Sequence, residues 1–108
     1  MHLGSMVNCG VLAKKNYKYI LLNNSSHESV GSQKTLINKT NLKYLSKGLG
    51  FENYIEIKNK REIVSKLNFF LKSNKKTFLN VRIMEGSVTN LSRPKKFTKI
   101  KENFIKNH

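Results

Sequence analysis

The sequence predicts an α/β fold in which a parallel sheet carries helices on its faces. Three short runs of aromatic, β-branched and aliphatic residues predict strands over 17–22, 54–58 and 77–84. Apolar residues spaced three and four positions apart precede and separate these runs, and this spacing predicts helices. Because strands that alternate with helices usually form a parallel sheet, we expect one small domain of this kind in the 108 residues.

The first predicted helix covers residues 2–15. Its apolar face consists of Leu3, Met6, Val7, Gly10 and Val11. Lysines at 14 and 15 suit the negative end of a helix dipole. The small residues Gly4, Ser5, Cys9 and Gly10 would let the helix lie close to a neighbour. Cys9 has apolar neighbours and is the single cysteine, so we expect a buried structural thiol in a reducing cytoplasm.

The run Tyr17–Leu22 (YKYILL) predicts a buried strand that ends at Asn23-Asn24. The 17 residues that follow, 23–39, are polar and show neither a helical nor a strand period. A connection of that length is unusual in a compact domain, so this loop is the first place to look for function.

The second half of the chain continues the alternation. Thr40 is expected to cap a helix that carries Leu42, Leu45 and Leu49 and ends at Gly48 and Gly50. A strand over 54–58 precedes a helix that begins at Asn59 or Lys60, and the last strand covers 77–84. The apolar face of that helix consists of Ile63, Val64, Leu67, Phe70 and Leu71.

The predicted domain looks incomplete at its N-terminus. Its sheet has only three strands, and its first element is a helix with no strand before it. We therefore expect 1–86 to be part of a domain, either a fragment or one that depends on a partner, and 87–108 to be a polar tail. With lysines flanking its apolar residues, the tail after Pro94 could form a short amphipathic helix or remain mobile.

Charge and hydropathy narrow the classes of function. The net charge is +15, but 18 of the 21 basic residues are lysines spread along the whole chain, so we expect no specific nucleic-acid partner. A basic nucleic-acid-binding module nevertheless stays an alternative. No apolar run approaches the roughly 20 residues that span a bilayer, and the first residues lack the features of a signal peptide, so no membrane partner is expected.

The polar loop begins where ligands bind in open parallel sheets, at the carboxyl end of a strand. Asparagine side-chain oxygens and backbone carbonyls suit Mg²⁺, which also takes oxygens from a bound phosphate. Gly31 and the neighbouring serines would let the backbone approach a ligand closely. An ordinary polar turn is the alternative, because Asn and Ser favour turns in any case.

The loop also resembles a known motif. An apolar strand that ends in Asn-Asn is similar to the second half of the cofactor motif of thiamine-diphosphate enzymes. The stretch LLNNSSHESVGSQKT resembles the phosphonopyruvate decarboxylase branch, whose usual pattern is close to LNNGAHDSVGGQPT. MHLGSM, Glu85-Gly86-Ser87 and Leu91-Ser92-Arg93-Pro94 also resemble segments of that branch, in the same order.

The resemblance implies a thiamine-diphosphate- and Mg²⁺-dependent decarboxylase that converts phosphonopyruvate to phosphonoacetaldehyde and CO₂. It implies that Asn24 gives its side-chain oxygen to Mg²⁺, that Ser26 gives a backbone carbonyl, and that Asn23 shapes the turn. The implied cofactor-binding residues are Asn23, Asn24, Ser25, Ser26, Ser29 and Gly31. Met1, Gly4 and Ser5 would pack near the cofactor, and Gln33 would shape the loop.

The candidate catalytic residues implied by the resemblance are His27 and Glu28. They would lie, with Ser29, beside the diphosphate or the reacting end of the cofactor. For His27 a solvent-exposed loop histidine is the alternative, and for Glu28 the alternative is a carboxylate that orders the loop.

The chain departs from the usual pattern at several positions. Ser25, Ser26 and Ser32 replace Gly, Ala and Gly, and Lys34 replaces proline. Val88 stands where a basic residue is expected, which leaves Arg93 as the clearest cation of the tail. Sulfopyruvate decarboxylase and acetolactate-synthase-like subunits therefore remain alternatives to phosphonopyruvate decarboxylase.

The resemblance also implies partners. The family's pyrimidine-binding domain, on the same or a partner chain, supplies the glutamate that activates the cofactor, and the full-length protein is expected to be a homo-oligomer. The aspartate of the family's Gly-Asp-Gly turn would fall before Met1. We therefore expect the chain alone to be inactive, as a truncation or as a partner subunit without catalytic activity of its own.

Overall fold

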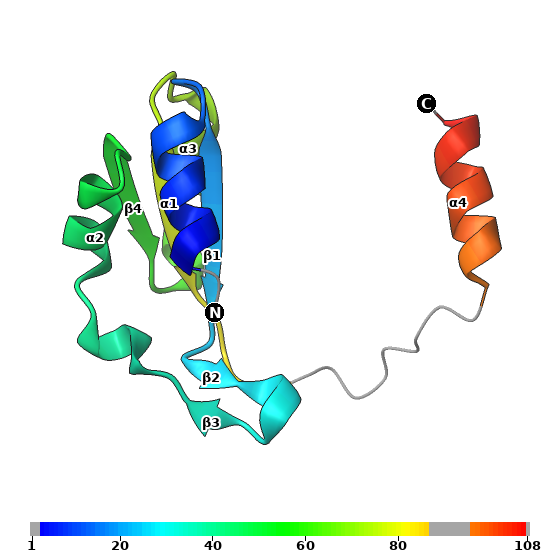
Figure 1. The fold of residues 1–108 in the computed structure, drawn as a ribbon, viewed down its shortest axis with the longest axis horizontal. Coiled ribbons are helices and arrows are strands. Elements are labelled where there is room, and N and C mark those ends of the chain that lie inside the picture. The colour runs from blue at the N-terminus through cyan, green and yellow to red at the C-terminus, as the bar shows by residue number, and fades with distance from the viewer. Residues whose placement is uncertain (1–2, 87–95, 108) are drawn as a thin grey trace.

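The computed structural model describes residues 3–86 and 96–107. A three-stranded parallel sheet forms the body, with the strand order β1-β5-β4 (Figure 1). The strands are β1 (Lys18–Asn23), β4 (Asn53–Ile57) and β5 (Thr77–Arg82). The predicted α/β class and parallel sheet are confirmed.

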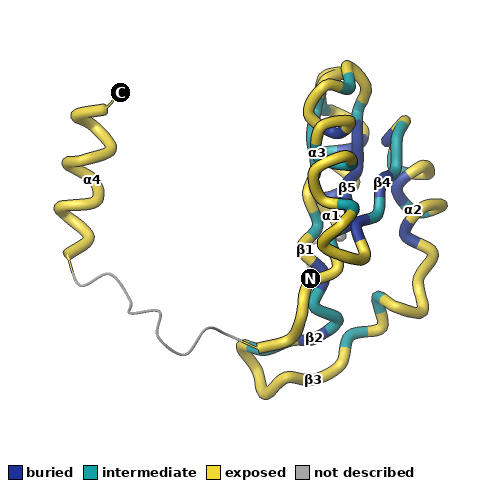
Figure 2. Tube along the Cα trace, turned by 180° about the vertical axis from the view of Figure 1, so that it is seen from behind, coloured by how far each residue is buried: buried dark blue, intermediate teal, exposed yellow. Residues whose placement is uncertain are grey.

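Helices cover both faces of the sheet. On one face, α1 (Leu3–Leu12) and α2 (Leu42–Gly48) lie over a core that includes Met6, Phe51 and Phe78. On the other face, α3 (Ile63–Lys72) covers a core made of Ile55, Ile57, Phe70 and Leu79. Figure 2 shows the buried residues along β4, β5 and the inner side of α2. Strand β5 is the most buried because it has a strand on each side and helices above and below.

Strand β1 differs from the buried strand that its apolar sequence predicts. It lies at one edge of the sheet, and the side chains of Ile20 and Leu22 are 52% and 63% exposed. These residues pair with Leu79 and Val81, so they lie on the α3 face of the sheet. Helix α3 packs on β4 and β5 and leaves this part of the face open, so the prediction of a buried strand is wrong for its α3 side.

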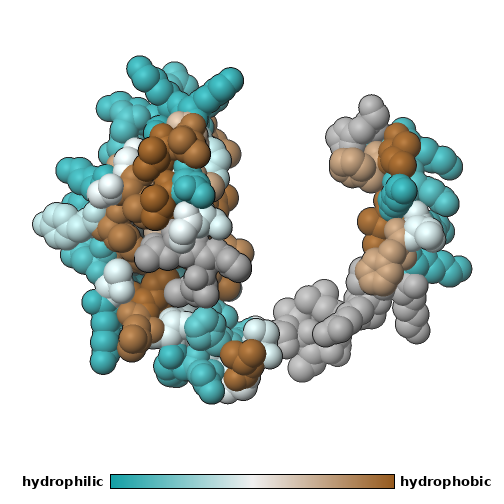
Figure 3. All heavy atoms as spheres, viewed as in Figure 1, coloured by the Kyte–Doolittle hydropathy of each residue, from teal (hydrophilic) through white to brown (hydrophobic). Residues whose placement is uncertain are grey.

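Helix α1 is only partly buried. Met6 faces the core, whereas Val11 and Leu12 are exposed, and Figure 3 shows hydrophobic atoms gathered over this helix. Cys9 is half-buried rather than buried, and its thiol forms a hydrogen bond with the Tyr17 side chain. Gly4 has no atom within 4 Å of a Cβ position, so it makes no close helix contact.

The polar loop after β1 contains short regular elements that the sequence pattern does not predict. A two-stranded antiparallel ladder joins β2 (Ser26–His27) to β3 (Gln33–Lys34). The 3₁₀ turns η1 (Glu28–Val30) and η2 (Leu36–Lys39) precede and follow β3. Elements of two to four residues are too short to produce a detectable hydrophobic period.

The predicted helix boundaries shift by one to four residues. Asn41, rather than Thr40, caps α2, because its side chain accepts a hydrogen bond of 3.2 Å from the Tyr44 N–H. Gly50, with φ of 87°, ends that helix as expected. A 3₁₀ turn, η3 (Lys60–Glu62), precedes α3.

The tail contains the helix α4 (Phe97–Lys106), which lies away from the sheet in Figure 1. Figure 3 shows its hydrophobic side chains on one side and its hydrophilic ones on the other. The positions predicted at Met1, Ser87, Val88 and 91–94 lie outside the described residues. Within the described ranges, no helix has the length and apolar character to cross a membrane.

Candidate functional site

The Asn23-Asn24 pair forms the turn at the carboxyl end of β1. The Asn23 side-chain oxygen accepts a hydrogen bond of 3.0 Å from the Ser25 N–H, and the Asn24 oxygen accepts one of 3.1 Å from the Ser26 N–H. The Ile83 N–H donates to the Asn23 carbonyl at 3.0 Å, which ties the turn to the end of β5. Each asparagine thus shapes the backbone two residues ahead, as Asx turns do.

The turn requires two serines in a conformation that favours glycine. The φ angles of Ser25 and Ser32 are 59° and 56°, and that of Gly31 is 89°. Backbone hydrogen bonds from Thr35 to Ser25 (2.9 Å) and from Ser32 to His27 (3.0 Å) hold the loop in this shape. A left-handed conformation costs roughly 1–2 kcal/mol for a residue with a Cβ, so the rest of the loop has to stabilise it.

The predicted site residues gather in this loop but differ in burial. Ser26 is buried, Asn24, Ser25 and Glu28 are half-buried, and His27, Ser29 and Gly31 are exposed. Gly4 and Ser5, predicted near the cofactor, are exposed on α1. The Glu28 carboxylate accepts a hydrogen bond from the Gly86 N–H, and Lys34 pairs with Glu85. Glu28 thus makes a contact that orders the loop, and its catalytic role, like that of His27, stays a prediction.

The loop has oxygen atoms without partners, which bears on a metal or phosphate ligand. The hydroxyls of Ser26 and Thr35 are buried and have no hydrogen-bond partner among the described residues. The described part of the chain brings together no group of three His, Cys, Asp or Glu side chains around a metal position. A hard cation at this turn would therefore take neutral oxygens from this chain and its remaining ligands from a phosphate, from water or from other protein. The amide and hydroxyl oxygens of the loop fit a Mg²⁺ site in which this chain supplies only some of the ligands.

Comparison with known proteins points to decarboxylases. The chain is 28% identical over 95 residues to the phosphonopyruvate decarboxylase of Streptomyces viridochromogenes, which is 88% of this chain and 24% of that protein. It is 27% identical over 95 residues to the enzyme of the same name from Streptomyces hygroscopicus. It is 42% identical over 53 residues to sulfopyruvate decarboxylase subunit beta of Methanocaldococcus jannaschii, covering 48% of this chain and 28% of that subunit.

The chain is similar to two kinds of decarboxylase. It spans about a quarter of the length of these curated relatives. No family model and no solved structure matches it. The similarity to the decarboxylases thus rests on sequence alone.

The positive φ angles agree with the decarboxylase-like pattern of the loop. Ser25 and Ser32 stand where the usual phosphonopyruvate decarboxylase pattern has glycine, and these are the two non-glycine residues with left-handed backbone among the described ones. Positions that favour glycine for conformational reasons thus occur where the resemblance places them. The sequence departs from the pattern at these two residues while the backbone keeps the conformation that glycine allows.

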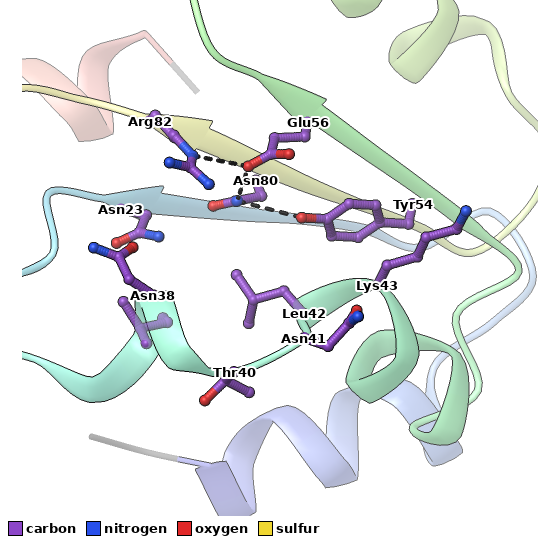
Figure 4. A pocket seen from close by; sticks show the side chains of 11 residues that line it. Asn23, Asn38, Thr40, Asn41, Leu42, Lys43, Tyr54, Glu56, Asn80 and Arg82 are labelled. Atoms are coloured by element: carbon purple, nitrogen blue, oxygen red, sulfur yellow. Dashed lines mark hydrogen bonds and ion pairs between the residues drawn. The ribbon is translucent and has the colours of Figure 1, made fainter.

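Sequence reasoning missed a second polar group beside the turn, on the α1–α2 face of the sheet. Asn80, in the middle of β5, donates from its amide nitrogen to Tyr54 (3.3 Å) and Glu56 (3.2 Å), and Arg82 Nε donates to the same Glu56 oxygen at 2.9 Å (Figure 4). Asn23 and Arg82 are paired across β1 and β5. The polar Asn80 within the apolar strand run was the signal that could have identified this group.

Proposed function

We propose that the chain is the C-terminal, diphosphate-side part of a thiamine-diphosphate- and Mg²⁺-dependent 2-oxo acid decarboxylase. Residues 1–86 would belong to the cofactor-binding domain and 87–108 to its tail. The observation that carries the proposal is the Asn23-Asn24 turn with left-handed backbone at Ser25 and Ser32, positions where the decarboxylase pattern has glycine. The similarity to named decarboxylases supports the same reaction class.

The roles proposed for the chain are to bind and orient. The Asn24 side-chain oxygen, which accepts one hydrogen bond from Ser26, retains a lone pair for Mg²⁺. The Ser26 carbonyl would be a second ligand, and the buried hydroxyls of Ser26 and Thr35 have hydrogen bonds left to give. Thiamine diphosphate, when bound, supplies the electron sink that decarboxylation of a 2-oxo acid needs. His27 and Glu28 would lie beside its reacting end.

Phosphonopyruvate is the proposed substrate, because the two relatives matched over 88% of the chain are named phosphonopyruvate decarboxylase. Sulfopyruvate is the second candidate, since the relative with 42% identity over 53 residues is a sulfopyruvate decarboxylase subunit. Both are three-carbon 2-oxo acids with a second strong anionic group. Such a group favours cations in the site, and the net charge of +15 provides a field that attracts either substrate.

The open edge of β1 supports a larger protein around this chain. The chain crosses from β4 to β5 through α3 on one face of the sheet, and from β1 to β4 through α2 on the other face. The two crossings run in opposite directions across the sheet, as two right-handed connections must. Because α1 lies on the α2 face, the same rule places any strand that leads into α1 beyond β1. Such a strand would make β1 an inner strand, and an element packed on the α3 face of the wider sheet would cover Ile20 and Leu22.

The pyrimidine-binding domain would be a further part of the complete protein, on the same or a partner chain, in a homo-oligomer. The chain alone would then lack the groups that activate the cofactor and would not decarboxylate phosphonopyruvate. Turnover of phosphonopyruvate by the isolated chain would contradict this division of roles.

The test is cofactor binding by the complete protein that contains this chain, measured by calorimetry with thiamine diphosphate in the presence of Mg²⁺ and after its removal by a chelator. We expect binding that requires Mg²⁺ and that weakens about 10- to 100-fold in Asn24→Ala, the range seen when a metal site loses a supporting group. Asn68→Ala, on the exposed side of α3, is the matched control and should bind normally. Binding that is independent of Mg²⁺, or equal in both variants, would refute the proposal.

A further inference from the structure

A pocket of about 300 Å³ opens at the carboxyl ends of the three strands, on the face covered by α1 and α2 (Figure 4). The ends of the strands form one wall and the segment 37–43 forms the other. Its lining residues are Asn23, Ile37, Asn38, Thr40, Asn41, Leu42, Lys43, Tyr54, Glu56, Asn80 and Arg82. Asn24 does not line it, so the pocket is distinct from the metal position proposed above.

The strand wall of the pocket contains a buried hydrogen-bond acceptor that has no donor among the described residues. Asn80 is 1% exposed, and its amide nitrogen is turned to Tyr54 and Glu56. Glu56 fixes this orientation, because a reversed amide would set two oxygens against each other. The Asn80 Oδ1 atom is consequently buried without a partner among the described residues. In Figure 4 this oxygen points to the side on which Asn23 lies.

Both walls of the pocket also carry donors. The side-chain oxygens of Asn23 and Asn38 both accept hydrogen bonds from Ser25, at 3.0 Å from its N–H and 3.0 Å from its hydroxyl respectively. Their amide nitrogens donate to no partner within the described ranges. The Arg82 guanidinium, whose Nε is bound to Glu56, also lies on the pocket wall. The pocket therefore combines several donors with one buried acceptor.

The charges around the pocket favour an anion. Arg82 and Lys43 line it beside a single carboxylate, Glu56, in a chain with a net charge of +15. The volume lies at the lower end of the range for small-molecule sites, which fits a ligand of a few heavy atoms. A buried polar atom in a native structure normally has a partner, so the free Asn80 oxygen points to a ligand that carries a donor.

We propose that this pocket binds a small oxyanion that bears a neighbouring hydroxyl or amino group. The oxyanion would accept hydrogen bonds from Arg82 and from the amides of Asn23 and Asn38. The hydroxyl or amino group would donate to Asn80 Oδ1 once a small movement of the side chains at the pocket wall exposes that oxygen. The inference does not depend on the proposed decarboxylase, since neither the cofactor nor Asn24 takes part, although Asn23 belongs to both sites.

The test compares two acids that differ in one hydroxyl group. The chain, labelled with ¹⁵N, is titrated with L-lactate and with propionate, and the side-chain amide signals of Asn23, Asn38 and Asn80 are followed by NMR. We expect lactate to shift these signals with a dissociation constant on the order of 1 mM. Propionate should bind at least about tenfold more weakly, because it leaves the buried acceptor unpaired. Equal binding of the two acids, or shifts spread over the surface lysines, would overturn the proposal.

Two variants assign the binding to the pocket. Arg82→Gln should weaken lactate binding about tenfold or more, and Asn80→Leu should abolish the preference for lactate over propionate. Lys58→Gln is the matched control, because Lys58 pairs with Glu56 at 3.5 Å but does not line the pocket. Arg82 is 53% exposed and its replacement is expected to leave the fold intact, so this variant decides the question if Asn80→Leu does not fold. Unchanged lactate binding in Arg82→Gln would refute the site.

Discussion

The Cβ position of Gly10 lies 1.9 Å from the carbonyl oxygen of Leu49, so α1 touches the end of α2 with its backbone. The contact is reciprocal, because the Cβ position of Gly50 lies 3.0 Å from the Gly10 carbonyl oxygen. Lys76 also donates from its side chain to that Gly10 carbonyl at 2.8 Å. Glycine at position 10 thus lets α1 lie over the core close to α2.

Replacing Gly10 with alanine should destabilise the chain by about 1–3 kcal/mol, because the added methyl group overlaps backbone that has no room to move. Gly4→Ala is the matched control in the same helix. Its Cβ meets nothing within 4 Å, so the better helix propensity of alanine should stabilise the chain by up to about 1 kcal/mol. Urea unfolding followed by circular dichroism measures both free energies, and equal effects in the two variants would contradict the close contact.

The loop serines give a prediction of the opposite sign. Ser32→Gly should raise the free energy of unfolding by up to about 1 kcal/mol, because glycine adopts the observed positive φ without strain. Ser25→Gly relieves the same strain but loses the hydroxyl hydrogen bond to Asn38, so its gain should be smaller. Ser29→Gly, in the 3₁₀ turn between them, should lower it by roughly 0.5–1 kcal/mol, since glycine there only adds freedom to the unfolded chain. The same urea titration distinguishes the three variants. Destabilisation by all three would mean that the loop has a different shape in solution.

Tyr54 makes the stability depend on alkaline pH. Burial raises the pKa of the Tyr54 phenol above its ordinary value of 10.0, although the hydrogen bond from Asn80 acts in the other direction. Because the pKa is higher in the folded state, this stabilisation is fully present below pH 10.0 and is lost as the pH rises through the folded pKa. The wild-type chain should therefore lose stability faster than Tyr54→Phe as the pH rises from 10 to about 11.

Urea unfolding of both chains across that range measures the difference. Tyr17 titrates in the same range, because its hydrogen bond with Cys9 and its burial raise its pKa, but it is present in both chains and cancels in the comparison. Parallel pH profiles for the two chains would show that Tyr54 ionises as freely in the folded state as in the unfolded one.

The alternation of strands and helices could be predicted from the sequence because each element has its own hydrophobic period. The order of the strands could not. The runs that form β1 and β5 are similarly apolar, yet β5 is central and β1 is an edge. Which strand becomes central depends on crossovers between elements far apart in the chain, and local periodicity does not contain that information.

One part of the candidate site could likewise be predicted from the sequence, and the other part could not. The Asn23-Asn24 turn could be placed at a strand end because the pair directly follows an apolar run. The group around Glu56 and Arg82 becomes visible only with the register, which sets Glu56 beside Asn80 and Asn23 beside Arg82. Register between distant strands fixes which side chains share a face, so this part of the site required the structure.

The open face of β1 gives the last prediction, which compares two leucines on the same face of the sheet. Leu22 is 63% exposed, whereas Leu79, in the core beneath α3, is fully buried. In the isolated chain Leu79→Ala should therefore cost about 2–5 kcal/mol and Leu22→Ala well under 1 kcal/mol, because the second change removes little buried apolar area and leaves no cavity. Urea unfolding of the two variants measures this difference.

The same substitution also tests whether other protein covers β1. If the sheet continues beyond β1 in the complete protein and a further element packs on its α3 face, Leu22 is buried there, and Leu22→Ala should cost about 2 kcal/mol or more in that protein. The isolated chain should self-associate through the exposed face, and Leu22→Lys should reduce this association in sedimentation velocity experiments. A cost for Leu22→Ala that is equally small in the complete protein would show that this face of β1 remains open, and it would remove this support for a larger protein around the chain.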